Sequence, residues 1–178
     1  MTSRAAESAF LIPRRLRWLW LTLGVVLLDR ITKGWFESQT PEGWHREVIH
    51  NFIYLVHSKN AGIAFGVFAD SASLLTRVML IAGSAVVIGA LAWLFVKGHA
   101  GGSLTAAGLA LLLGGATGNV TDRIVSGAVT DFLEVWLGSY HWPAFNVADS
   151  AITIGAILIL FEVLFTKHHH EVSERQPS

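Results

Sequence analysis

Aspartate is the residue type in this chain whose chemistry could break a covalent bond. The sequence contains no cysteine, which excludes a thiol nucleophile, disulfides, Cys-ligated zinc and lipidation of the chain itself. It also contains no His-Glu-x-x-His motif of zinc proteases and no Gly-x-Ser-x-Gly motif of serine hydrolases. Two neighbouring aspartates cannot both ionise easily, so they share one proton. The ionised aspartate can then take a proton from water while the protonated one polarises a carbonyl, which hydrolyses an amide without a cofactor or a metal ion.

The elements that must position these aspartates are those of a membrane protein. Of the 178 residues, 52% are hydrophobic and 15% are charged, whereas a soluble domain carries about 25% charged residues. The formal net charge is zero, so no basic surface argues for a nucleic-acid partner. A spanning helix needs about 20 mostly apolar residues. We therefore expect one membrane domain, residues 1–166, with spans at about 16–35, 75–96, 104–122 and 148–166, and a cytoplasmic tail, 167–178.

The first apolar stretch has an alternative interpretation. Arg14, Arg15 and Arg17 precede Trp18–Leu28 in the way that the charged region of a signal peptide precedes its apolar region. No cleavage site of the small-x-small type follows, and the stretch continues into charged residues from Asp29 onward. Together with the later apolar stretches, this favours an uncleaved first span.

Positive residues indicate the orientation of the spans. They precede the first span, lie in the connection after the second and follow the fourth: Arg4, Arg14, Arg15, Arg17, Lys97 and Lys167. Short loops rich in lysine and arginine stay in the cytoplasm. We therefore expect both termini in the cytoplasm, and residues 36–73 and 121–147 on the outer side of the membrane.

This topology brings polar residues of three spans and one loop to the same depth, near the outer face. They comprise four aspartates, two amides and two cations: Asp29, Lys33, Asn119, Asp122, Arg123, Asp131, Asn146 and Asp149. Ionisable groups at membrane depth are costly and by default indicate function. A proton- or ion-coupled transporter would use the same acids, but the sequence has no obvious inverted repeat. A purely structural scaffold would not need acids gathered at one depth.

Several of these residues also have a structural interpretation. Asp29 and Lys33 are four residues apart, so they can pair on one helix face, which is favoured over a contact with substrate. Asp122 and Arg123 are favoured as a clamp between loops over a catalytic role. Asn146 can cap the fourth span, or it can hold Asp149 or a substrate carbonyl, and neither role is favoured.

Asp149 and Asp131 are harder to explain structurally. Asp149 lies in the first turn of an apolar span, where the helix dipole stabilises a carboxylate, yet Asn146 already offers a cap. Asp131 is flanked by Val129, two residues before it, and by Phe132-Leu133 directly after it, so it projects from an apolar segment at the membrane interface. The residues alone do not choose between these two aspartates and the other two.

The outer loops have patterns of their own. His45–His57 is rich in residues that favour strands, Ser58–Gly62 is typical of a turn, and Ile63–Phe68 is expected to return as a strand. Val129–Trp136 has apolar residues at helical spacing, which favours a short interfacial helix. The polar tail from His168 is expected to be disordered, and its His168–His170 tract is favoured as a solvated basic end over a metal site. The expected fold is an all-α membrane protein of four transmembrane helices with a small periplasmic β-sheet and this interfacial helix.

Five segments, in this order, resemble the motifs of lipoprotein signal peptidase, also called signal peptidase II. They are Asp29-Arg-Ile-Thr-Lys33, Asn60-Ala-Gly-Ile-Ala-Phe-Gly66, Gly114-Gly-Ala-Thr-Gly-Asn-Val-Thr-Asp-Arg123, Gly127-Ala-Val-Thr-Asp-Phe132 and Phe145-Asn-Val-Ala-Asp-Ser150. Each segment alone is a weak signal, but their order and spacing are specific. The resemblance covers the chain from about Trp18 to Phe165.

The resemblance implies a multi-pass enzyme of the bacterial inner membrane, with both termini cytoplasmic and its active site near the periplasmic face. Such an enzyme removes the signal peptide of diacylglyceryl-modified prolipoproteins just before the lipidated cysteine, needs no cofactor or metal, and is inhibited by globomycin. It implies that Asp131 and Asp149 form the catalytic dyad. It also implies a set of residues that bind substrate or support the site: Asp29, Lys33, Asn60, Gly62, Asn119, Asp122, Arg123 and Asn146. We expect a monomer whose partners are substrate and membrane lipid.

Overall fold

The computed structural model describes residues 14–62, 74–97 and 102–173. The predicted return strand Ile63–Phe68 lies outside these ranges. A short 3-10 helix leads into the first long helix, and helices and strands then follow in this order: η2 (Arg14–Trp18), α2 (Leu19–Gln39), β1 (His45–Ile49), β2 (Ile53–Asn60), α3 (Leu74–Lys97), α4 (Ser103–Val125), β3 (Val129–Leu137), β4 (Tyr140–Phe145) and α5 (Val147–Ser173).

The described part of the chain is mostly helical, and three of its helices are long and apolar enough to cross a membrane: α3, α4 and α5. Only 6% of the most apolar window of α3 is buried, against 56% for α4. Because α3 leaves its apolar side chains uncovered while α4 is enclosed, α4 is the central helix. It packs against α2, α3 and α5.

Glycines let the neighbouring helices approach α4 closely. A Cβ atom on Gly108 would lie 2.6 Å from the carbonyl oxygen of Gly155 on α5, and one on Gly155 would lie 2.6 Å from the Gly108 oxygen. A Cβ atom on Gly114 would lie 2.8 Å from the Val25 side chain of α2. Helices in lipid gain little from the hydrophobic effect, so they associate largely through close van der Waals packing, which small residues at such crossings permit. These small residues bring the ends of α2, α4 and α5 within side-chain reach of one another.

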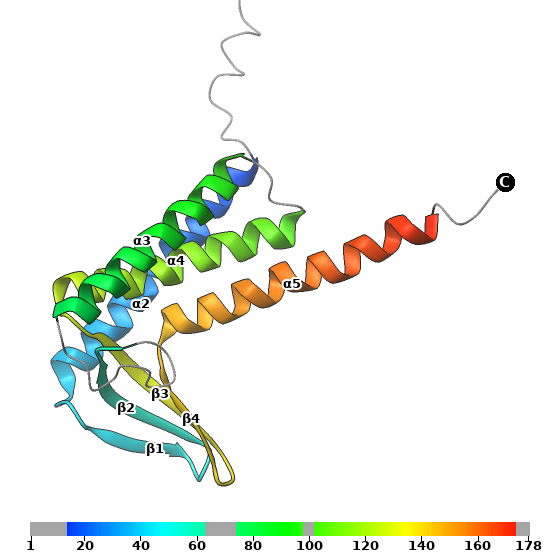
Figure 1. Ribbon diagram of the computed structural model, residues 1–178. Helices are drawn as coiled ribbons and strands as arrows, with labels where there is room; N and C mark the ends of the chain where they lie inside the picture. The colour runs from blue at the N-terminus through cyan, green and yellow to red at the C-terminus, as the bar shows by residue number, and fades with distance from the viewer. Residues whose placement is uncertain (1–13, 63–73, 98–101, 174–178) are drawn as a thin grey trace, which may run out of the picture.

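A four-stranded antiparallel sheet lies at the end of the helices where α2 ends and α5 begins (Figure 1). Its strand order is β1-β2-β3-β4. β1 and β2 form the strands that were predicted within His45–His57, so this part of the prediction is confirmed. The predicted turn from Ser58 was wrong, because Ser58 and Asn60 remain in β2 and pair with Asp131 and Val129 of β3.

The prediction of an interfacial helix over Val129–Trp136 was also wrong, since these residues form most of strand β3. β3 pairs with β2 on one side and β4 on the other, which satisfies the backbone groups that a helix would have satisfied internally. Its β-branched and aromatic residues fit this pleated, half-buried position. The side chain of Phe132 stacks on Phe36 of α2, with ring centroids 4.8 Å apart, and joins the sheet to that helix.

Helix α5 is longer than the predicted fourth span. It continues to Ser173, so the expectation of disorder from His168 was wrong for this part of the tail. No glycine or proline interrupts the sequence between the span and this segment. Its leucine, phenylalanine and lysine residues are compatible with a helix.

Candidate active site

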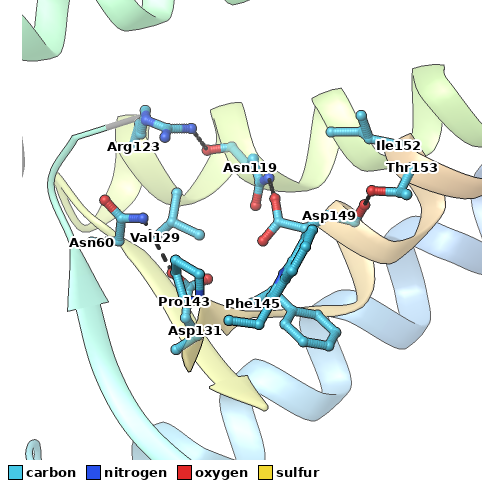
Figure 2. A pocket seen from close by; sticks show the side chains of 12 residues that line it. Asn60, Asn119, Arg123, Val129, Asp131, Pro143, Phe145, Asp149, Ile152 and Thr153 are labelled. Carbon is cyan, nitrogen blue, oxygen red and sulfur yellow. Dashed lines mark hydrogen bonds between the residues drawn. The ribbon is translucent and has the colours of Figure 1, made fainter. Parts of the chain in front are cut away.

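The polar residues predicted to converge do meet at the end of the helices beside the sheet. A cavity of about 320 Å³ opens there between β4, β3 and the ends of α4 and α5. Figure 2 shows Asn60, Asp131, Asn119 and Asp149 facing this space from four different elements. The lining combines these polar groups with an apolar wall: Asn60, Asn119, Arg123, Val129, Asp131, Trp142, Pro143, Ala144, Phe145, Asp149, Ile152 and Thr153.

Asp131 lies near the start of β3 and is only 3% exposed. Its Oδ1 accepts a hydrogen bond from Nδ2 of Asn146 at 2.7 Å, and its Oδ2 accepts one from Nδ2 of Asn60 at 3.2 Å. Burial, and then the negative charge of Asp149, raise the pKa of Asp131 to about 7. Near neutral pH this carboxyl group therefore retains a proton that an exposed aspartate would have lost.

Asp149 belongs to the first turn of α5 and is half-buried. Its Oδ2 accepts from the backbone N–H of Asn146 at 3.2 Å, and the Oδ1 of Asn146 accepts from the backbone N–H of Asp149 at 3.0 Å. This reciprocal arrangement is a capping box. Oδ1 of Asp149 accepts a further hydrogen bond from Nδ2 of Asn119 at 2.8 Å, so both carboxylate oxygens of Asp149 have fixed positions.

The capping role predicted for Asn146 is confirmed, and its backbone N–H also binds the carboxylate of Asp149, whereas the contact of its side chain with Asp131 was not predicted. Asn146 caps α5 through its Oδ1, and its Nδ2 holds Asp131. One asparagine side chain therefore joins the helix that carries Asp149 to the strand residue Asp131. Its burial, at 1% exposure, leaves these contacts little freedom to rearrange.

Arg123 connects α4 to the segment that follows β2. Its Nη2 donates to the carbonyl of Gly62 at 2.7 Å, and its Nη1 donates to the carbonyl of Asn119 at 3.3 Å. The backbone N–H of Gly62 in turn donates to Oδ1 of Asn60 at 3.0 Å. These contacts agree with the clamp interpretation of Arg123, and the guanidinium group also lies on the cavity wall.

Asp29, Lys33 and Asp122 form a buried ion cluster behind the cavity. Nζ of Lys33 lies 2.7 Å from Oδ2 of Asp29 and 2.7 Å from Oδ2 of Asp122, and Lys33 is completely buried. The predicted pair between Asp29 and Lys33 is thus confirmed. Lys33 also donates to Oδ1 of Asn119 at 3.1 Å, while Arg30 donates to Oδ1 of Asp122 at 3.0 Å. A buried charge that loses its partner is strongly destabilising, so this cluster fixes α2 against α4.

Sequence reasoning missed a second polar cluster beside the site, formed by Glu37, Lys59 and Thr130. Lys59 directly precedes Asn60 and Thr130 directly precedes Asp131, but no local spacing indicates that either meets Glu37. Sequence reasoning also missed the apolar wall from β4 and α5. Within the described ranges, no group of three or more His, Cys, Asp or Glu side chains is arranged to hold a metal ion.

The arrangement suits general acid–base hydrolysis. Asp131 and Asp149 line the same cavity, Asp149 is among the groups that raise the pKa of Asp131, and amide donors orient both carboxyl groups. A carboxyl group that retains its proton beside one that is ionised can polarise a carbonyl while its partner activates water.

Comparison with known proteins points to one family. Residues 21–165 match the family model described as signal peptidase (SPase) II. The lipoprotein signal peptidase of Desulforapulum autotrophicum is 39% identical over 143 residues, which are 80% of this chain and 88% of that protein. That of Cupriavidus taiwanensis is 42% identical over 156 residues, which are 87% of this chain and 86% of that protein.

A solved structure has the same fold. It is described as a bacterial membrane enzyme determined by the in meso method at 2.3 Å, and it is 28% identical in sequence. The TM-score is 0.77, and the match covers 91% of this chain and 93% of the other. A second bacterial membrane enzyme determined by the same method matches with a TM-score of 0.73 and 30% identity.

Proposed function

The chain belongs to the signal peptidase II family of aspartyl peptidases, which remove signal peptides from prolipoproteins, and we propose that Asp131 and Asp149 are its catalytic pair. The observation that carries this proposal is their arrangement. Two carboxyl groups from separate elements line one cavity and are joined through Asn146. The remaining aspartates among the described site residues, Asp29 and Asp122, are engaged with cations outside the cavity lining.

The two aspartates have different roles in the proposed mechanism. Asp131 holds the shared proton, since burial and the charge of Asp149 raise its pKa to about 7. Ionised Asp149 takes a proton from a water molecule, whose oxygen attacks the scissile carbonyl. Asp131 donates its proton to the carbonyl oxygen, and the tetrahedral intermediate forms. Asp149 then passes its proton to the leaving amide nitrogen, Asp131 recovers a proton as the carbonyl re-forms, and the C–N bond breaks.

Four helices cross the membrane in this proposal, with α2 joining α3, α4 and α5. Asp29, Arg30 and Lys33 interrupt the apolar sequence of α2, but Asp29 and Lys33 pair inside the protein and Arg30 binds Asp122. Outward side chains such as Trp20 and Ile31 are exposed and apolar, as lipid contact requires. The positive-inside rule then puts both termini in the cytoplasm and the cavity near the periplasmic face of the inner membrane.

The shape and lining of the cavity suit a lipid-bearing peptide. The cavity lining offers amide, carboxyl and guanidinium groups from Asn119, Asp131 and Arg123 to bind the peptide backbone, and apolar surface from Phe145 and Ile152. The diacylglyceryl chains of the substrate cysteine stay in lipid while the bond before that cysteine reaches the aspartates. We expect globomycin to compete with substrate here, and the enzyme to act as a monomer without a cofactor.

Replacement of each aspartate by asparagine tests the proposed pair. We expect Asp131→Asn and Asp149→Asn each to abolish cleavage, by at least about a thousandfold, because neither proton-transfer role survives. A gel-shift assay with purified diacylglyceryl-modified prolipoprotein measures cleavage, and the amount of each variant in the membrane is compared by immunoblot.

Glu134→Gln is the matched control, because Glu134 lies on β3 three residues beyond Asp131 and contacts His45 and His141 away from the cavity lining. It is expected to cleave normally. Retained cleavage by either aspartate variant would refute the pair. Asp122→Asn is expected to lower both the membrane level and the activity, since it breaks the buried ion cluster.

A further inference from the structure

Each proposed catalytic aspartate directly follows a residue that is bonded to a carboxylate of α2. The backbone N–H of Ala148, which precedes Asp149, donates to Oδ1 of Asp29 at 2.9 Å. The hydroxyl of Thr130, which precedes Asp131, donates to Oε1 of Glu37 at 2.6 Å. One helix therefore holds both segments that bring the aspartates together.

The contact at Glu37 is reinforced by Lys59 of β2. Nζ of Lys59 lies 2.7 Å from Oε1 of Glu37 and donates to the Thr130 hydroxyl at 2.7 Å. Thr130 is completely buried, while the side chains of Glu37 and Lys59 are only about one quarter exposed, at 24% and 25%. Charge-assisted hydrogen bonds in such a partly dry place are stronger and shorter than neutral ones on the surface.

The separation of the two anchor points is fixed by helix geometry. Asp29 and Glu37 are eight residues apart in an unbroken helix, which corresponds to about 12 Å along its axis. The stacked rings of Phe36 and Phe132 support the same junction, because they lie next to Glu37 on α2 and two residues after Thr130 on β3. A rigid helix with one contact at each point can set how closely β3 approaches the start of α5.

We propose that Glu37, together with Lys59, is a positioning residue for the peptidase reaction: it holds Thr130, and through it the strand that carries Asp131, at the distance from Asp149 that catalysis needs. This proposal rests on the assignment of the Asp131–Asp149 pair. Glu37, Lys59 and Thr130 are absent from the cavity lining, so they act through Asp131 and not on the substrate.

The role predicts a specific kinetic signature. Loss of the Glu37–Thr130 contact frees β3 to shift, and a displacement of about 1 Å at a catalytic group can cost up to about a hundredfold in rate. Substrate binding uses other side chains, so KM is expected to stay within about twofold of the original value. The charged groups that act on Asp131 are Asp149, Lys33 and Arg123. A greater distance from Asp149 weakens its repulsion of a second negative charge and lowers the pKa of Asp131.

Thr130→Val and Thr130→Ser form the decisive comparison, made on the purified full-length enzyme with diacylglyceryl-modified prolipoprotein. Valine keeps the shape and β-branching of threonine but lacks the hydroxyl. We expect its kcat to fall at least about tenfold with KM little changed, and the alkaline limb of its pH–rate profile to move to lower pH. Serine keeps the hydroxyl and is expected to retain most of the rate. Glu37→Gln should resemble Thr130→Val, and Lys59→Met should have a smaller effect because Glu37 still binds Thr130.

The controls separate positioning from folding and from the identity of the pair. A variant that merely folds poorly lowers the active fraction without moving the pH limb, and Glu134→Gln on the same strand should leave both unchanged. Normal kcat and an unmoved limb in Thr130→Val and Glu37→Gln would overturn the positioning role, and so would a loss confined to KM. Cleavage by Asp131→Asn would instead overturn the assignment of the pair, whatever the Thr130 variants do.

Discussion

At the scale of single residues, the protonation of Asp131 is a balance between burial and a neighbouring charge, which favour its protonated form, and two amide donors, which favour its ionised form. Its pKa is raised from 3.8 to about 7, first by burial and then by the charge of Asp149, while the hydrogen bonds from Asn60 and Asn146 act in the opposite direction. The folded enzyme therefore binds a proton that the unfolded chain has lost between these two values. Activity that needs this proton is lost as the pH rises through about 7, the folded-state pKa. The stability linked to it is fully present below 3.8 and is lost progressively as the pH rises from there to about 7.

Asn60→Ala tests this account of the proton. Asn60 donates to the carboxylate at 3.2 Å, so its removal disfavours the ionised form and raises the pKa of Asp131 further. We expect the alkaline limb of kcat, near pH 7 in the original enzyme, to move to higher pH by about half a unit or more. Rates measured from pH 5 to 9 decide the sign, and an unmoved limb or a move to lower pH would contradict the account. This direction is opposite to that expected for Thr130→Val.

Which residue contacts can be predicted from sequence depends on how local they are. The Asp29–Lys33 pair and the capping role of Asn146 follow from spacings within one helix turn, and both occur. The contact between Glu37 and Thr130 joins residues that are 93 positions apart, so no local spacing could indicate it. The same limit kept Asp131 and Asp149 equivalent to other aspartates until the motifs distinguished them.

At the scale of elements, the helices were easier to predict than the sheet. An apolar run long enough to span lipid is visible in one segment, which is why the predicted cores of the later spans fall within α3, α4 and α5. The segment Val129–Trp136 has apolar residues on both faces because one face meets α2 and the other meets the cavity. Two buried faces produce a nearly continuous apolar pattern, and period alone cannot separate such a strand from a helix.

The close crossing of α4 and α5 depends on glycine at particular positions. We therefore predict that alanine destabilises the helix packing at these positions and not at other glycines. A Cβ atom on Gly155 would lie 2.6 Å from the backbone oxygen of Gly108, whereas one on Gly89 of α3 would have nothing within 4 Å. Alanine favours helix over glycine by about 1 kcal/mol, so Gly89→Ala is expected to be neutral or stabilising. Gly155→Ala must separate α4 from α5, at a cost of about 1–3 kcal/mol.

Thermal unfolding in detergent measures the difference between these two alanine variants. We expect a lower Tm for Gly155→Ala. We also expect lower peptidase activity, because Asp149 lies on α5 and is displaced when α5 moves away from α4. Equal Tm values for Gly155→Ala and Gly89→Ala would mean that the crossing tolerates a methyl group, and would contradict close glycine packing as the support of the site.

At the scale of the whole molecule, the polar and charged groups of the site gather at one end, whereas the sides of the helices are apolar. The sheet, the ion cluster and the cavity all lie where α2 ends and α5 begins, and apolar side chains of α2, α3 and α5 remain exposed along the helices. Sequence alone indicates this polarity through its basic flanks. It could not indicate that four strands from two separate loops combine into a single sheet above the site, because the β2–β3 pairing that joins the two local hairpins is long-range.

The orientation of this polar end can be tested directly, because the chain has no cysteine and any introduced thiol is unique. Ser139 lies exposed in the turn between β3 and β4, whereas Ser173 ends α5 at the opposite end of the molecule (Figure 1). We expect a membrane-impermeant maleimide to label Ser139→Cys in intact spheroplasts, and Ser173→Cys only after the membrane is permeabilised, since positive flanks retain the termini inside. Both variants should still cleave prolipoprotein, which confirms that the labelled molecules are folded. The reverse labelling pattern would place the aspartates at the cytoplasmic face, where the bond before a periplasmic lipidated cysteine is out of reach, and the proposed topology would fail.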